Sequence, residues 1–134
     1  MSNQLDQLFV SGKEVDQELV AKILSPFLKI DRDSCTIVPN EQWQELNNDL
    51  KIILFLLARK VMKLRGLTID NEGAVPSEIE NGTGIKGGSV RPRLRSLLDE
   101  KVISRTKDGR YFVPNYSLMR IKARVNTQLE EDKK

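Results

Sequence analysis

A helix, a tight turn and a second helix are predicted by a forty-residue stretch, 74–113, which reads AVPSEIENGTGIKGGSVRPRLRSLLDEKVISRTKDGRYFV. Pro76 favours a helix start, because its missing N–H is one that a first helical turn leaves unpaired in any case. Gly82-Thr83-Gly84 predicts the end of this short helix, and Lys86-Gly87-Gly88 predicts a turn after it.

The second helix of the stretch is expected over residues 89–101. Ser89 is a favourable N-cap, and Pro92 then falls in the first turn, where it costs no hydrogen bond. At 100° per residue, one apolar stripe forms along this helix. Its members are Val90, Leu94, Leu97 and Leu98.

Three arginines lie near the start of this second helix. Arg93 and Arg95 point away from the apolar stripe, and Arg91 lies at its margin. Arginine can bond guanine O6 and N7 through two parallel N–H groups, so such a helix start suits the DNA major groove. The amides of Gly87-Gly88-Ser89, at a helix N-terminus, can also hold a phosphate.

A hairpin follows, with Asp108-Gly109 between two β-prone segments, and it predicts a two-residue type I′ loop. Lys107 and Arg110 would then face each other, which is unfavourable for like charges. A phosphate between them would relieve the repulsion, whereas in the alternative both side chains splay into water at the hairpin tip. Arg105 is expected on the same face as Lys107.

Charge is distributed unevenly along the chain. The 134 residues hold 22 Lys and Arg against 19 Asp and Glu. Residues 1–50 contain four basic and nine acidic residues, whereas residues 74–125 contain eleven basic and five acidic ones. A basic half in an otherwise acidic chain is typical of proteins that bind a polyanion.

Residues 77–113 resemble the winged helix-turn-helix superfamily of bacterial and archaeal DNA-binding domains. The resemblance rests on Ser77-Glu78-Ile79, Gly84 to Arg91, Leu94 to Leu98, Val102-Ile103 and the Asp108-Gly109 hairpin. It implies a recognition helix, 89–101, in the major groove and a wing, 104–113, on the backbone or in the minor groove. The chain departs from the family at Glu80, where Ala or Gly is usual, and at Asn81-Gly82.

The resemblance implies a sequence-specific binder of double-stranded DNA, which we expect to be a small transcriptional regulator. The implied contact residues are Lys86, Ser89, Arg91, Arg93, Arg95, Arg105, Lys107 and Arg110. The alternative is a winged-helix protein-interaction module in a larger assembly, without specific DNA binding, because a fold does not fix a function.

The whole chain is expected to be α+β and mainly helical, as a winged helix-turn-helix domain over 47–116 between two extensions. Residues 1–46 would add a helix over 14–24, a hairpin of 27–30 with 35–38, and a helical turn around Trp43 and Leu46. Residues 1–12 are expected to be a loose start. This extension is a candidate site for a protein partner.

A long helix is expected to begin at a cap, Asn48 or Asp49, and to stop at Gly66. Its first half, Leu50 to Ala58, is apolar nearly all round and predicts a buried central element. Its second half is amphipathic, with polar residues at Arg59, Lys60, Lys63 and Arg65. Any effector pocket is expected between this helix and the N-terminal segment.

Residues 117–134 predict a C-terminal helix followed by a frayed tail, 130–134. Leu118, Ile121, Val125 and Leu129 form an apolar stripe, which either closes the domain or pairs with a second subunit in a homodimer. Arg120, Lys122 and Arg124 would form its polar side and add DNA-backbone contacts.

Composition argues against an enzyme. The chain has no His and one Cys, which removes His-based catalytic triads and the usual zinc ligand sets, so no catalytic residue, metal or cofactor is expected. Cys35 is interpreted as a small core residue, Trp43 as a core anchor, and Tyr111, Phe112 and Tyr116 as packing the hairpin against the core.

A cytoplasmic location without membrane contact is expected, because a single Cys suits a reducing compartment. Met1 to Gln7 shows no signal peptide, and the longest apolar run, Ile52 to Ala58, is far shorter than the roughly 20 residues that cross a bilayer.

Overall fold

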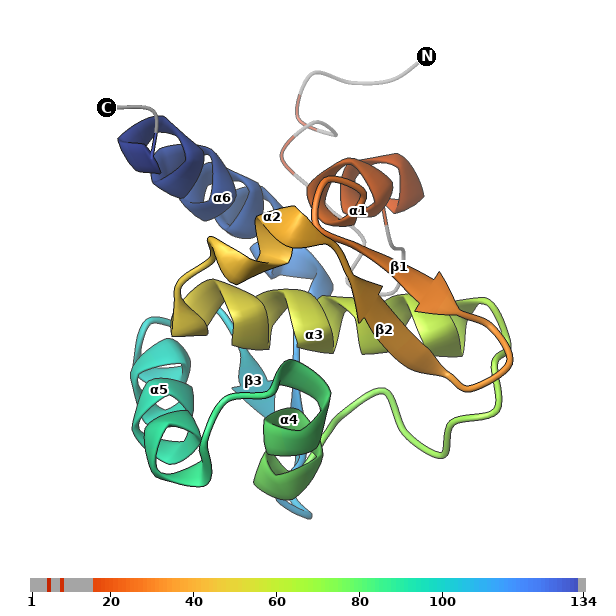
Figure 1. The fold of residues 1–134 in the computed structure, drawn as a ribbon. Coiled ribbons are helices and arrows are strands. Elements are labelled where there is room, and N and C mark those ends of the chain that lie inside the picture. The colour runs from red at the N-terminus through yellow and green to blue at the C-terminus, as the bar shows by residue number, and fades with distance from the viewer. Residues whose placement is uncertain (1–4, 6–7, 9–15, 133–134) are drawn as a thin grey trace.

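The computed structural model describes residues 5, 8 and 16–132, and this part of the chain is α+β and mainly helical. Its elements are α1 (Gln17–Leu24), β1 (Leu28–Asp31), β2 (Thr36–Pro39), α2 (Glu41–Gln44), α3 (Asn48–Leu64), α4 (Pro76–Thr83), α5 (Gly87–Asp99), β3 (Ser104–Arg105), β4 (Tyr111–Phe112), a 3-10 turn η2 (Asn115–Ser117) and α6 (Leu118–Asp132). Helix α3 runs through the middle, with α1, α2 and α6 on one side and α4, α5 and β3 on the other (Figure 1).

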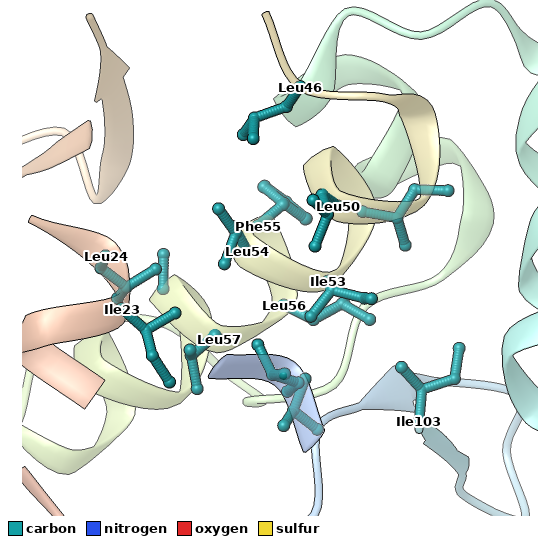
Figure 2. Packing of buried hydrophobic residues seen from close by; sticks show 14 of the residues in the cluster. Ile23, Leu24, Leu46, Leu50, Ile53, Leu54, Phe55, Leu56, Leu57 and Ile103 are labelled. Atoms are coloured by element: carbon teal, nitrogen blue, oxygen red, sulfur yellow. The ribbon is translucent and has the colours of Figure 1, made fainter. Parts of the chain in front are cut away.

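Helix α3 is the centre of the core, as its apolar first half predicts. Residues 52–54 and 56–58 are each 0% exposed, so this part of the helix is surrounded on all sides. Ile23 and Leu24 of α1 lie at one flank of α3, and Ile103 lies at another (Figure 2). The cap is Asn47, one residue before the first of the two expected caps, because Asn47 Oδ1 accepts the Leu50 N–H at 2.9 Å. Gly66 ends it in the left-handed conformation, as expected.

The second half of α3 is less amphipathic than its sequence indicates. Lys60 was expected on the polar side, but only 6% of it is exposed. Its Nζ lies 2.8 Å from Glu72 Oε2, in a contact that is an ion pair without ideal hydrogen-bond geometry. The neighbouring Arg59 donates to the carbonyls of Asn71, Glu72 and Gly73. These two side chains hold the connection between α3 and α4 against the helix.

The N-terminal helix and hairpin form where the sequence predicts them. Asp16 caps α1 through the Leu19 N–H, while the expected start at 14–15 and the loose start over 1–12 lie outside the described residues, except for Leu5 and Leu8. In the hairpin, Asp31 pairs with Thr36, so the loop is 32–35, one residue later than expected. Cys35 lies in this loop with φ of 57° and is half-buried, so its interpretation as a core residue is wrong.

Helix α2 is one turn that anchors an aromatic residue. Asn40 caps it by accepting the N–H groups of Gln42 and Trp43. Trp43 is 2% exposed, which confirms its role as a core anchor. This short element fixes the path of the chain into α3.

Helices α4 and α5 are joined by the three residues 84–86. Pro76 stands at the first position of α4, and Gly84 ends the helix with φ of 79°, both as expected. The start of α5 differs from the expectation, because Lys86 is the N-cap and Ser89 lies inside the first turn. Pro92 therefore falls in the second turn and removes the N–H that would bond to the Gly88 carbonyl. Helix α5 ends at Asp99, two residues before the predicted end.

The β3–β4 hairpin has a three-residue loop, 107–109, and the predicted type I′ turn is wrong. Thr106 N–H donates to the Arg110 carbonyl at 2.8 Å, and Gly109 N–H donates to the Thr106 carbonyl at 3.1 Å. Only Gly109 in this loop has a positive φ, which is the pattern of a type I turn followed by a bulge. Lys107 consequently lies in the loop and does not face Arg110. An isolated antiparallel bridge between Ala74 and Tyr111 ties the residues before α4 to this pair.

Helix α6 closes the core of its own chain. Leu118, Ile121 and Val125 are at most 5% exposed, and Leu129 packs against the same cluster. Gln128 bridges Asn47 N–H and the Glu45 carbonyl, which ties α6 to the connection between α2 and α3. The stripe that could have served a homodimer is thus used within the chain.

Two further expectations are corrected near the C-terminus. The helix continues to Asp132, into the segment 130–134 that was expected to form the tail, and residues 133–134 lie outside the described residues. Tyr116 is 61% exposed and does not pack the hairpin, whereas Tyr111 packs against the core.

Candidate nucleic-acid interface

The outer face of α5 is basic. Arg91 and Arg95 are exposed, and so is the capping residue Lys86. None of these three makes an ion pair with a carboxylate of the described residues. Val90, Leu94 and Leu97 are buried on the opposite side, and they fix which way the arginines point. The outward orientation expected of Arg95 therefore agrees with the structure, and Arg91, which was expected at the margin of the apolar stripe, is exposed as well.

Arg93 lies on the flank of α5 that approaches the start of α3. Its Nη1 is 3.9 Å from Asp49 Oδ1, and 53% of the side chain stays exposed. The same carboxylate lies 3.4 Å from Arg124 Nη2, and Arg124 also pairs with Glu100 at 2.6 Å. Arg93 is thus loosely held, while Arg124 is used inside the chain rather than for the backbone contacts expected of α6.

The N-terminus of α5 already has an anionic neighbour. A Cβ built at Gly87 would lie 2.8 Å from Glu80 Oε1, so the carboxylate at the end of α4 reaches the first turn of α5. Negative charge is favourable at a helix N-terminus. Glu80 would therefore compete with a phosphate for the predicted site at the amides of Gly87-Gly88-Ser89. The Ser89 side chain itself is exposed.

Two basic residues of the β3–β4 hairpin are exposed. Lys107 lies in the loop, and Arg105 lies opposite Tyr111 on the neighbouring strand. The Arg105 guanidinium stands 5.7 Å from the centre of the Tyr111 ring, a cation–π contact that holds the side chain along the strand. Neither cation is paired with an acid in the part of the chain that the structure describes.

Arg110 has a structural position that the sequence does not predict. Its Nη1 donates to the Gly73 carbonyl and to Glu78 Oε1, both at 3.2 Å, and its Nε lies 3.4 Å from Asp108. About a quarter of the side chain is exposed, 26%. The expectation that Arg110 faces Lys107 across a phosphate is corrected, because this arginine anchors the hairpin to the start of α4.

The hairpin loop favours the charged form of the Asp108 carboxyl. The Thr106 hydroxyl donates to it, and this hydrogen bond, with a smaller effect from Arg110, lowers the pKa of Asp108 below its ordinary value. The carboxylate therefore stays charged in the loop next to Lys107. The loop 107–109 therefore carries no net charge, and the positive charge of the hairpin comes from Arg105 and Arg110.

The start of α5 and the hairpin loop lie at the same edge of the molecule (Figure 1). The exposed cations of these two elements are Lys86, Arg91, Arg95, Arg105 and Lys107, and we name this set the basic edge. Within residues 5, 8 and 16–132 no cluster of three metal-ligating side chains is present. No helix among them has the length and apolar character needed to cross a membrane.

Four residues that shape this edge were not foreseen from the sequence. Asp49 and Glu80 place negative charge beside Arg93 and the start of α5, while Glu78 and Arg59 hold Arg110 and the connection before α4. The only signal for Glu80 was its departure from the family pattern. Comparison with protein-family models, with curated proteins and with solved structures finds no match for this chain.

Proposed function

We propose that this protein binds double-stranded DNA, with α5 in the major groove and the β3–β4 hairpin beside it as a wing. The order α3, bridge at Ala74, α4, α5, β3 and β4 supports this proposal, because it is the order expected of a winged helix-turn-helix domain. In this arrangement the recognition helix is the second helix of the helix-turn-helix pair. The protein acts as a binding protein and regulator, and its role requires no catalytic group.

The observation that carries the proposal is the basic edge. Its five cations come from two separate elements, and none is paired with a carboxylate of the described residues. Cations left without partners are available to displace counterions from a phosphate backbone, which is the main source of DNA affinity. Arg91 and Arg95 are suited to reading bases, and Lys86, Arg105 and Lys107 are suited to phosphates.

Two of the eight expected contact residues take lesser roles in this proposal. Arg110 supports the wing from behind, and Arg93 reaches DNA only by leaving Asp49, from which it is already 3.9 Å distant. Ser89 is exposed in the first turn of α5, and a serine hydroxyl there can donate to a phosphate.

The test compares two triple variants that lose the same charge. Neutralising Arg91, Arg95 and Lys107 to Ala removes part of the basic edge, whereas neutralising Lys22, Lys29 and Arg32 to Ala removes three exposed cations from α1 and the β1–β2 hairpin. Duplexes selected from a random pool at about 150 mM salt supply the ligand, and fluorescence anisotropy measures affinity.

The first variant is expected to lose at least tenfold in affinity for the selected duplex, and the second less than twofold. Equal losses in both variants, or no enrichment of any sequence, would contradict specific DNA binding. The second result would favour the protein-interaction module that the same fold also permits.

A further inference from the structure

An apolar groove lies on the other side of α3, between α1, β1 and the C-terminal end of α3. Its volume is about 330 Å³, which is room for roughly ten water molecules and more than a packing defect provides. Val20, Leu24 and Leu28 form the floor, and each is at most 5% exposed. Val61 and Leu64 of α3 form one wall. This is the region where the sequence places any effector pocket.

Cationic residues are among those that line the groove. Lys29 and Arg65 line it, and Arg65 also lines a neighbouring hollow of about 220 Å³ together with Arg32. All three cations are exposed, and none is ion-paired with a described carboxylate. Among the residues that the structure describes, no Asp or Glu lines either hollow. The two hollows share Ile30, Val61 and Arg65, so a molecule that fills the first meets the arginine at its edge.

We propose that this groove binds an amphiphilic organic anion, with an aliphatic chain on the apolar floor and an acidic head group at Arg65, Lys29 and Arg32. The size and apolar lining are those of a small-molecule site, in which few polar groups orient the ligand. The three unpaired cations decide the sign of the head group. A neutral or cationic ligand of the same length gains nothing from them.

This inference goes beyond DNA binding and does not depend on it. The groove lies on the face of α3 that carries α1, whereas α4 and α5 lie across the helix (Figure 1). The groove is therefore open whether or not a polyanion occupies the basic edge, and it can be tested without any nucleic acid.

The experiment titrates the full chain with octanoate, decanoate and dodecanoate below their micelle concentrations, using calorimetry. One ligand per chain is expected, with affinity rising about fourfold for each added methylene. Dodecylammonium, which has the same chain length and the opposite charge, is expected to bind roughly tenfold more weakly than dodecanoate.

Three variants locate the site. Ala21→Phe places a ring from the exposed face of α1 into the groove and is expected to abolish binding. Arg65→Ala is expected to lower the affinity several-fold, and Lys63→Ala, which removes the same charge from the same helix outside the groove, less than twofold. Thermal unfolding of each variant confirms that it is folded, and Arg65→Ala keeps the test valid if Ala21→Phe is unstable.

Three results would overturn the proposal. They are equal binding of dodecanoate and dodecylammonium, the absence of saturable binding by any of the carboxylates, and sedimentation as a dimer that Ala21→Phe converts to a monomer. The last would mean that a second copy of the chain covers the groove. Loss of DNA binding in the basic-edge variant would have no bearing on any of these readouts.

Discussion

Gly82 of α4 and Phe55 of α3 meet where the two helices pack together, and only a hydrogen at Gly82 fits this contact. A Cβ there would overlap Cε1 of the Phe55 ring. The ring is 6% exposed and belongs to the core cluster, and it also borders a hollow of about 350 Å³ beside Gly82, so a Cβ at Gly82 would force it to shift. Gly82 lowers the helix propensity of α4, but its missing side chain lets α4 pack closely against α3.

Gly82→Ala is expected to destabilise the protein by about 1–2 kcal/mol. The forced displacement of the ring costs more than the roughly 1 kcal/mol that alanine gains over glycine in a helix. Urea unfolding measures the change. Gly88→Ala is the matched control, because a Cβ at Gly88 in the first turn of α5 meets nothing within 4 Å. This control is expected to be neutral or stabilising, and equal destabilisation of both variants would contradict the contact.

Arg110→Ala is expected to destabilise the fold by about 1–2 kcal/mol, because it removes charged hydrogen bonds to Gly73 and Glu78 that are partly exposed. Lys107→Ala, three residues earlier and exposed in the loop, is expected to change stability by less than about 0.5 kcal/mol. Chemical unfolding of both variants tests this difference. If Lys107→Ala proved the more destabilising of the two, the anchoring role of Arg110 would be wrong.

Glu80→Gln is expected to tighten DNA binding by about two- to fivefold. The substitution removes an anion from the N-terminus of α5, and such a charge is worth about 0.3–1 kcal/mol. The same loss is expected to lower the stability of the free protein slightly. Glu45→Gln, an exposed carboxylate at the end of α2, is the control for affinity and should leave it unchanged. A weaker complex with Glu80→Gln would count against DNA at the basic edge.

Salt dependence separates phosphate contacts from base contacts. Each phosphate contact contributes about 0.9 to the slope of log affinity against log salt. Lys107→Ala is therefore expected to reduce the slope by about 1 and to weaken selected and random duplexes alike. Arg95→Ala is expected to cost about 1–3 kcal/mol on the selected duplex and much less on random DNA. Anisotropy titrations at several salt concentrations give both quantities. Identical behaviour of the two variants would contradict the assignment of Arg95 to base contacts and Lys107 to phosphate contacts.

Acid is expected to weaken the β3–β4 hairpin through Asp108. The hydrogen bond from Thr106 lowers the pKa of this carboxyl below its ordinary 3.8, so its contribution to stability is complete above that value and is lost as the pH falls through the lowered pKa. Asp108→Asn removes the titration. The gap in thermal midpoint between the wild type and this variant should narrow from about pH 6 to about pH 2.5. A gap that stays constant with pH would show that the charged form of Asp108 is not favoured by folding.

Local signals in the sequence predicted the elements well. Pro76, Gly66 and Gly84 mark helix ends by backbone preferences that do not depend on the rest of the fold. The apolar run of α3 likewise predicted a buried central helix. These features act within a few residues, so one sequence is enough to read them.

Contacts between distant residues were not predictable in the same way. Asp49 meets Arg93, and Glu78 meets Arg110, only because α3, α4 and α5 pack together. The start of α5 shows the same limit, since two glycines weaken a helix locally and yet Gly87 and Gly88 are helical here. The hairpin loop depends on whether one residue or two adopt positive φ, and Asp108-Gly109 is compatible with both.

The length of α3 has a mechanical consequence. Its seventeen residues contain neither Pro nor Gly, so the helix behaves as a straight rod roughly 25 Å long. Leu64 near one end borders the amphiphile groove, and Asp49 near the other touches Arg93. Because both residues stand on one unbroken helix, a shift of the whole helix would move the wall of the groove and the partner of Arg93 together.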